Sequence, residues 1–261
     1  MKVIQQAKSL KVLVIGDSCI DKFVYGTCER LSPEAPVPVL KHTKTKEMPG
    51  MAGNVAENIK AFTPDVWLQT QSEHVEKIRY VDSKSNQHVL RFDIEPDYLG
   101  STFTVSNNPL AFKAVSSEFD IVIISDYNKG FVDFEQVLCF TEKMQQVVYV
   151  DSKKPDISCF KNSIVKLNQR EFEATGHTID STSTLIKTLG SKGASCNGQI
   201  YPSNPVEVFD VSGAGDTFLA AFAIFHSLTK DVTQSIKFAN KCAGIAVQKK
   251  GTYSLCGSDL L

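Results

Sequence analysis

Six strand-like runs separated by helical patterns constrain this chain more than any other feature of its sequence. The runs are residues 11–17, 65–70, 120–126, 146–151, 162–168 and 184–190, and helical periodicity covers 52–62, 108–119, 133–146 and 168–175. This order predicts a doubly wound α/β fold around a mainly parallel sheet, because helical crossovers join parallel strands. Ligands of such sheets bind at the carboxyl ends of the strands. Polar residues that follow the strands are therefore the first candidates for a functional site.

Two segments, at about 20–46 and 76–96, do not fit this scheme. Polar and apolar residues alternate along them without an intervening helix, which predicts a small antiparallel sheet outside the main layer. Such a sheet could act as a lid that closes over a substrate and excludes water. An edge extension of the main sheet is the alternative that the pattern leaves open.

Length, charge and cysteines narrow the class of protein. The 261 residues, 42% of them hydrophobic, predict a single domain over 1–261. The net charge of -1 argues against nucleic acid and anionic membranes as partners, and we expect a cytoplasmic protein because no signal-like or bilayer-length apolar run occurs. Seven cysteines without a CxxC pair and scattered histidines favour neither a disulfide framework nor a zinc site.

The segment Val211-Ser-Gly-Ala-Gly-Asp216 carries the clearest chemical signal. Gly213, Ala214 and Gly215 precede a helix, whose unpaired N–H groups and dipole attract an anion such as phosphate. A carboxylate there would repel phosphate, unless a hydroxyl lies between them. Asp216 would then accept the proton of that hydroxyl while the amides stabilise the transferred group.

A simple helix-capping acid is the alternative interpretation of Asp216. The following segment 217–228 is apolar nearly all round, which predicts a buried helix whose polar start opens into a fixed cleft. The sequence has no GxxxxGK[ST], no protein-kinase HRD with DFG and no GxGxxG after Ile15. A P-loop and a protein kinase are thereby excluded.

With DVSGAGDTF and PGMAGNVAENI together, the chain resembles the ribokinase (PfkB-type) family of carbohydrate kinases. GDSCIDKFVYG, RLSPEAPVPVL, SDYNKG and LNQREFEA are most similar to the kinase part of the heptose 7-phosphate kinase/ADP-heptose synthase enzymes. The resemblance implies a ribokinase-like α/β fold with a β lid, the use of ATP and Mg²⁺, and phosphorylation of a sugar hydroxyl. D-glycero-D-manno-heptose 7-phosphate or a related sugar is the acceptor it implies.

Site residues follow from the same resemblance. It makes Asp216 the base and the three residues before it the anion hole. Residues implied to bind the sugar are Asp21, Gly50, Asn54, Asp126 and Lys129. Residues implied to bind the nucleotide are Lys153, Asn168, Glu171, Thr188, Gly190, Gly193, Asn240, Ala243 and Gly244, with Glu171 acting on Mg²⁺ through water.

Several of these assignments have structural alternatives. Asn54 could merely cap its helix, Asn168 and Glu171 could form a capping pair, and the small residues near 243 could serve helix packing. Lys153 is expected near a phosphate, of either the sugar or the nucleotide.

The sequence also departs from the family pattern. Met51 replaces the second glycine of a Gly-Gly pair, and the chain is short between Phe62 and Ile78 and between Glu173 and Thr184. A second, nucleotidyl-transferring domain is not expected in this chain. A kinase for another sugar or nucleoside, and a nucleotide-binding scaffold without turnover, therefore remain as alternatives. An exposed antiparallel lid would leave open sheet edges and an apolar face. We therefore expect a homodimer that pairs through the lid.

Overall fold

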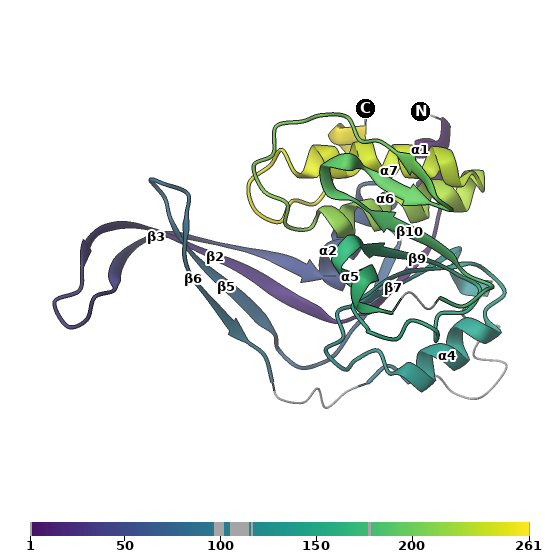
Figure 1. Ribbon diagram of the computed structural model, residues 1–261, viewed down its shortest axis with the longest axis horizontal. Coiled ribbons are helices and arrows are strands. Elements are labelled where there is room, and N and C mark those ends of the chain that lie inside the picture. Colours follow the sequence, from purple (N-terminus) through teal and green to yellow (C-terminus); the bar gives the residue numbers. More distant parts are fainter. Residues whose placement is uncertain (1, 97–101, 105–114, 116, 177–178, 261) are drawn as a thin grey trace.

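We describe the fold from a computed structural model, in which residues 2–96, 102–104, 115, 117–176 and 179–260 are placed. Two sheets organise the chain (Figure 1). The main sheet lies within the helical body, and the lid sheet projects away from that body as long, curved strands.

The main sheet has eight strands in the order β12-β11-β10-β9-β8-β7-β1-β4. They are β1 (Val12–Gly16), β4 (Val66–Gln69), β7 (Ile121–Asp126), β8 (Val148–Ser152), β9 (Ser163–Asn168), β10 (Thr184–Thr188), β11 (Ala194–Cys196) and β12 (Gln199–Tyr201). The six strands from β4 to β10 in that order are parallel, and β11 and β12 are antiparallel additions at one edge. The predicted mainly parallel sheet is thus confirmed, with strand positions within three residues of those expected.

Alternating side chains of the central strands enter two separate cores. In β1, Val12 and Val14 pack in one core and Leu13 and Ile15 in the other. All four are buried, because helices cover both faces of the sheet. This two-sided burial explains why the strands read as continuous apolar runs in the sequence.

Helices flank the main sheet on both sides. One face carries α1 (Lys2–Ala7), α2 (Ala52–Lys60), α6 (Ala214–Thr229) and α7 (Val232–Ala246). The other face carries α4 (Phe134–Lys143) and α5 (Gln169–Ala174), and two 3₁₀ turns are η1 (Gly190–Lys192) and η2 (Gly257–Leu260). The helix expected over 108–119 falls largely outside the described residues.

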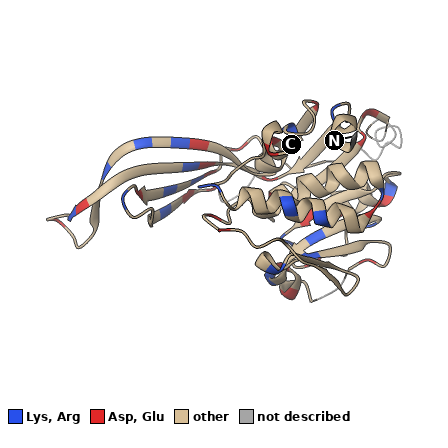
Figure 2. Ribbon diagram, turned by 90° about the horizontal axis from the view of Figure 1, so that it is seen from above, with Lys and Arg blue, Asp and Glu red and all other residues tan. Residues whose placement is uncertain are grey.

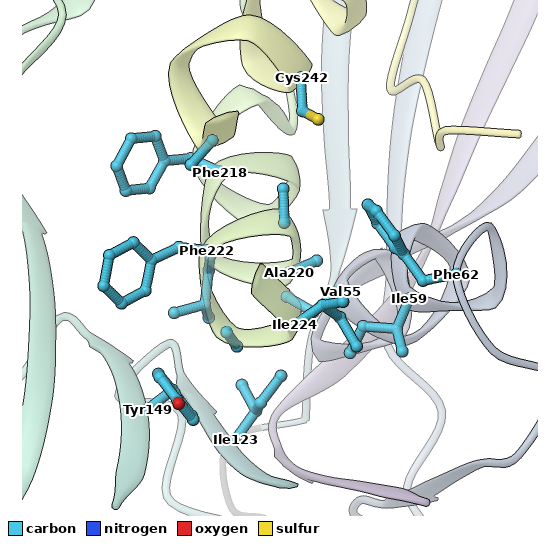
Figure 3. Close-up of a cluster of buried hydrophobic side chains, with 14 of the residues drawn as sticks. Val55, Ile59, Phe62, Ile123, Tyr149, Phe218, Ala220, Phe222, Ile224 and Cys242 are labelled. Atoms are coloured by element: carbon cyan, nitrogen blue, oxygen red, sulfur yellow. The ribbon is translucent and has the colours of Figure 1, made fainter. Parts of the chain in front are cut away.

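The helix α6 forms the centre of the larger core. Phe218 and Phe222 lie on one side of it, whereas Val55 and Ile59 of α2 approach another side (Figure 3). Ten of its residues are buried, including Asp216 at its start. Burying the apolar residues of α6 stabilises the fold and holds that first turn in a fixed position.

The lid sheet has four strands in the order β3-β2-β5-β6. They are β2 (Ser18–Leu31), β3 (Pro38–Met51), β5 (Glu76–Asp82) and β6 (His88–Ile94). Both hairpins are antiparallel as expected, but the central pair β2–β5 is parallel. The parallel pair arises because both strands leave the body in the same direction, joined through α2 and β4. The expected separate small sheet is confirmed.

Residues of both charge signs are interspersed among uncharged residues along the lid strands (Figure 2). Near the body, its strands are buried, as at Cys19 and Phe23, while Lys44 and Leu90 farther out are exposed. Within the described part of the chain, we find no helix with both the length and the apolar character needed to cross a bilayer.

Candidate active site

The turn before α6 brings a glycine into close contact with another part of the chain. Gly213 precedes the helix with a φ of 77°, a left-handed conformation that costs other residues free energy. A Cβ on Gly213 would lie 2.6 Å from Nδ2 of Asn54. The first glycine of the GAG turn is therefore required by both backbone angle and space.

Asp216 is buried at the start of α6 and accepts two hydrogen bonds. Asn54 donates from Nδ2 to Oδ2 over 2.8 Å, and the Tyr127 hydroxyl donates to Oδ1 over 2.9 Å. Burial raises the pKa of Asp216 to about 6, even though both hydrogen bonds act to lower it. The carboxylate is ionised at neutral pH and close enough to its pKa to take up a proton.

The backbone amides of the turn are largely available for an anion. Among the described residues, the N–H groups of Gly213, Gly215 and Asp216 have no hydrogen-bond acceptor, while Ala214 donates to the Val211 carbonyl over 3.3 Å. Open amides at the positive end of a helix suit a phosphoryl group. Ala214 contributes less to such a site than the sequence predicted.

A cavity of about 840 Å³ opens at the carboxyl ends of the parallel strands. Its walls contain the whole GAGD turn and every residue predicted on the nucleotide side, which are Lys153, Asn168, Glu171, Thr188, Gly190, Gly193, Asn240, Ala243 and Gly244. An apolar part, with Val206, Phe218 and Val247, lies beside these polar groups. This combination fits a nucleotide, whose base needs apolar walls and whose phosphates need cations and amides.

A lysine and an aspartate from neighbouring strands form a buried ion pair in this cavity. Lys166 of β9 contacts Oδ2 of Asp151 at the end of β8. Burial alone would lower the pKa of Lys166, but the charges of Asp151 and Glu171 outweigh it and raise that pKa. Oδ1 of Asp151 is buried and has no hydrogen-bond partner among the described residues. An unsatisfied carboxylate oxygen facing a cavity suits a hydrated cation or a ligand hydroxyl.

Asn168 and Glu171 form a complete capping box at the start of α5. Oδ1 of Asn168 accepts from the Glu171 amide over 2.9 Å, and the Asn168 amide donates to Oε2 of Glu171 over 2.7 Å. Burial, followed by the charge of Asp151, raises the pKa of Glu171. The capping alternative is therefore correct as geometry, but the cap uses only Oε2 of Glu171 and leaves Oε1 for another ligand.

These carboxylates fit a magnesium ion bound together with nucleotide phosphates. No group of three or more His, Cys, Asp or Glu side chains in the described ranges could hold a metal by itself. Mg²⁺ usually keeps several waters and takes one or two carboxylates plus substrate phosphates. Glu171 and the free oxygen of Asp151 suit that arrangement.

Two of the residues expected on the sugar side, Asp21 and Gly50, meet at the base of the lid sheet. A Cβ on Gly50 would lie 2.6 Å from Oδ2 of Asp21, so this glycine permits a close approach. Oδ1 of Asp21 pairs with Nη1 of Arg79 at 2.5 Å, and Thr252 donates to its Oδ2 over 3.2 Å. The Asp21 carboxylate is therefore already paired with the Arg79 guanidinium.

Asn54 does not cap its helix, since α2 begins after Met51 with no side-chain cap. Its amide instead reaches Asp216, and its Oδ1 accepts from Asn58 and Ser254. Met51, at the position of the expected second glycine, has a φ of 59° and is buried. The departure from glycine thus places a side chain in a strained backbone conformation next to the predicted sugar site.

Asp126 and Lys129, at the end of β7 and in the loop after it, do not line the cavity. Asp126 accepts from Ser152 and from the Asn128 amide, both over 2.8 Å. Lys129 pairs with Oε2 of Glu95 at 2.6 Å. Neither side chain lines the cavity, and their predicted contact with sugar stays a prediction.

Several residues of the site were not singled out from the sequence. Asp17 accepts from the amides of Tyr127, Lys129 and Phe131 and so shapes the loop after β7. This loop places the Tyr127 hydroxyl on Asp216. Asp17 follows a strand-like run, so the rule that polar residues after strands are candidates would have found it.

A nucleotide-sized cavity beside a buried carboxylate and an amide-lined helix start is the arrangement of a phosphotransferase that acts on a hydroxyl. The comparison with known families gives the particular class. Residues 135–258 match the model described as pfkB family carbohydrate kinase. This part of the chain therefore carries a pfkB family carbohydrate kinase domain.

Curated relatives share a third of the sequence. The chain is 33% identical over 308 residues to the bifunctional protein HldE of Helicobacter hepaticus, covering 98% of this chain and 64% of that protein. For the bifunctional protein HldE of Gluconacetobacter diazotrophicus, the identity is 33%, and 94% and 61% of the two chains are covered. The chain thus spans less than two thirds of the length of these relatives.

Solved structures show the same fold. A ribokinase from Thermotoga maritima has a TM-score of 0.69 and 17% identity, covering 96% of this chain and 98% of the other. Phosphofructokinase-2 from Escherichia coli has a TM-score of 0.72 and 17% identity, covering 96% of both chains. The predicted ribokinase-like fold is confirmed.

Proposed function

We propose that this protein transfers the γ-phosphate of ATP to a hydroxyl of a sugar phosphate, with Asp216 as the general base. The observation that carries the proposal is the convergence of Asp216 and the open amides of Gly213 and Gly215 at one end of a nucleotide-sized cavity. Because the reaction consumes ATP, we expect it to occur in the cytoplasm.

In this reaction, the acceptor oxygen attacks the γ-phosphorus as the bond to the ADP oxygen breaks. The hydroxyl proton passes to Asp216, and the amides of the turn stabilise charge on the transferred group. Lys166 and Lys153 line the same cavity and supply positive charge toward the phosphates. Mg²⁺, held through Glu171, would neutralise charge on the nucleotide phosphates.

The proposed acceptor is D-glycero-D-manno-heptose 7-phosphate or a related sugar. The resemblance of GDSCIDKFVYG, RLSPEAPVPVL and SDYNKG to heptose kinases supports this choice. A scaffold without turnover is less well supported, because the cavity keeps its cations, its capping box and its carboxylate together.

We further propose that two copies pair through their lid sheets. Large apolar side chains at the lid, Leu31, Leu90 and Phe92, are 65%, 55% and 52% exposed. A second lid sheet would cover them. Light scattering at micromolar concentration should give twice the mass of the chain, and a monomer would contradict the pairing.

The kinase proposal is tested by ADP release over a panel of sugars and sugar phosphates. Asp216→Asn should lower kcat by roughly 100-fold or more, because it removes the general base. Asp133→Asn is a matched control, since Asp133 caps α4 away from the cavity and asparagine caps equally well. A wild-type rate in Asp216→Asn would exclude the mechanism.

A further inference from the structure

Lys77 is a buried cation of the lid sheet that faces the sugar side of the site. Its side chain lies on β5 and is 9% exposed. Its ammonium is 3.3 Å from the Met51 sulfur and 5.4 Å from the centre of the Tyr127 ring. Met51 follows Gly50 at the start of α2, and Tyr127 bonds the carboxylate of Asp216. Lys77 therefore lies between the predicted sugar-binding turn and the residue that contacts the base.

No carboxylate in the described part of the chain lies within ion-pair distance of Lys77. A thioether is a weak acceptor, and a tyrosine ring offers only a cation–π contact. Burying an ammonium without a compensating charge destabilises a protein substantially. Its position at the site therefore calls for an anionic ligand.

Neighbouring carboxylates are already bound to other cations. Lys77 lies opposite Asp21 in β2 and opposite Asp93 in β6. However, Asp21 pairs with Arg79, and Asp93 accepts two hydrogen bonds of 2.8 Å from Arg91. Both carboxylates opposite Lys77 are therefore already bonded to an arginine.

We propose that Lys77 binds the phosphate group that the acceptor sugar already carries, and so selects sugar phosphates over neutral sugars. This inference rests on the proposed function. It extends that function by naming a residue that recognises the phosphate of the acceptor sugar. The γ-phosphate of ATP has the same chemistry, but Lys77 does not line the nucleotide cavity, whereas Lys153 does. Lys77 also contacts Met51, which does not line that cavity and directly follows Gly50 of the predicted sugar side.

The test compares two acceptors that differ only in their phosphate, mannoheptose 7-phosphate and mannoheptose. Steady-state transfer and equilibrium binding of both sugars are measured for the wild type and three variants. Lys77→Met keeps the length and apolar stem of the side chain but removes its charge, and Lys77→Arg keeps the charge. Lys44→Met is the matched control, because Lys44 is an exposed lysine of the same lid sheet.

We expect Lys77→Met to raise KM for the phosphorylated sugar by roughly 10- to 100-fold, the effect of losing one charge-assisted hydrogen bond. Its kcat should stay within about threefold of the wild type, because binding to the phosphate is equal in ground and transition states. Constants for the neutral sugar and for ATP should not change. Lys77→Arg should retain part of the preference, and Lys44→Met all of it.

Three outcomes would overturn the assignment: equal losses for both sugars, a selective loss of ATP affinity, or no loss. A wild type that phosphorylates both sugars equally well would also overturn it while leaving the kinase proposal standing. If no sugar is phosphorylated but mannoheptose 7-phosphate binds in a Lys77-dependent way, the kinase proposal fails and the assignment of Lys77 holds.

Discussion

The side-chain amide of Asn54 donates a 2.8 Å hydrogen bond to Oδ2 of Asp216, a residue 162 positions away in the sequence. The contact joins α2, which follows the lid hairpin, to the start of α6. A substrate hydroxyl that approaches Asp216 must share this carboxylate with Asn54 and Tyr127. The properties of the base are therefore set by both neighbours, which leads to the first prediction.

Activity should fall as the pH drops below about 6, because Asp216 becomes protonated. Removing the Tyr127 hydroxyl in Tyr127→Phe takes away a donor that stabilises the ionised carboxylate, so the pKa of Asp216 should rise and the acidic limb should move to higher pH. The measurement is the pH profile of kcat/KM. Tyr149→Phe is the control, since that buried hydroxyl bonds His226 in the core, and its profile should match the wild type.

Gly213→Ala should reduce both stability and activity. The left-handed backbone costs alanine about 1 kcal/mol, and its Cβ would meet the Asn54 amide at 2.6 Å. Gly198→Ala provides a matched comparison, because Gly198 has a φ of 79° but no atom within 4 Å of its would-be Cβ. Urea unfolding should show the smaller loss for Gly198→Ala, which should also keep full activity. Equal effects of the two variants would mean that the contact with Asn54 contributes nothing.

Lys166→Met should lower the free energy of unfolding by about 3–5 kcal/mol, because it leaves Asp151 buried without its cation. The double variant Lys166→Met/Asp151→Leu should recover most of this stability, since apolar pairs often replace buried ion pairs at little cost. Its ATP turnover should nevertheless stay low. Denaturant unfolding measures the role of Lys166 in stability, and ADP release measures its role in ATP turnover. Full turnover in the double variant would show that Lys166 acts only on stability.

Glu171→Gln should increase the Mg²⁺ concentration needed for half-maximal rate. Glutamine can still complete the capping box with Asn168, so stability should change by less than about 1 kcal/mol, while the charge that attracts the metal is lost. Glu173→Gln is the control, because Glu173 is exposed on the same helix and accepts a hydrogen bond from Gln169. If the Mg²⁺ dependence of Glu171→Gln is unchanged, Glu171 does not act on the metal.

Local periodicity was enough to predict most of the architecture. Burial of the main sheet on both faces produced the apolar runs at β1, β7 and β8, and the separate lid sheet followed from alternation at 20–46 and 76–96. The sequence did not predict the parallel pairing of β2 with β5. That pairing depends on the path that the chain takes through α2 and β4 between the two hairpins. Strand patterns carry no information about which non-consecutive strands become neighbours.

By itself, the sequence indicated the GAGD turn and the buried helix after it, because each depends on one short segment. The residues predicted on the nucleotide side came from the family resemblance, and they line one cavity. Only the tertiary structure decided that Asn54 and Tyr127 hold Asp216, that Lys166 pairs with Asp151, and that Lys77 forms no ion pair with any carboxylate of the described residues. Those relationships depend on distances between side chains from separate elements, which no local pattern encodes.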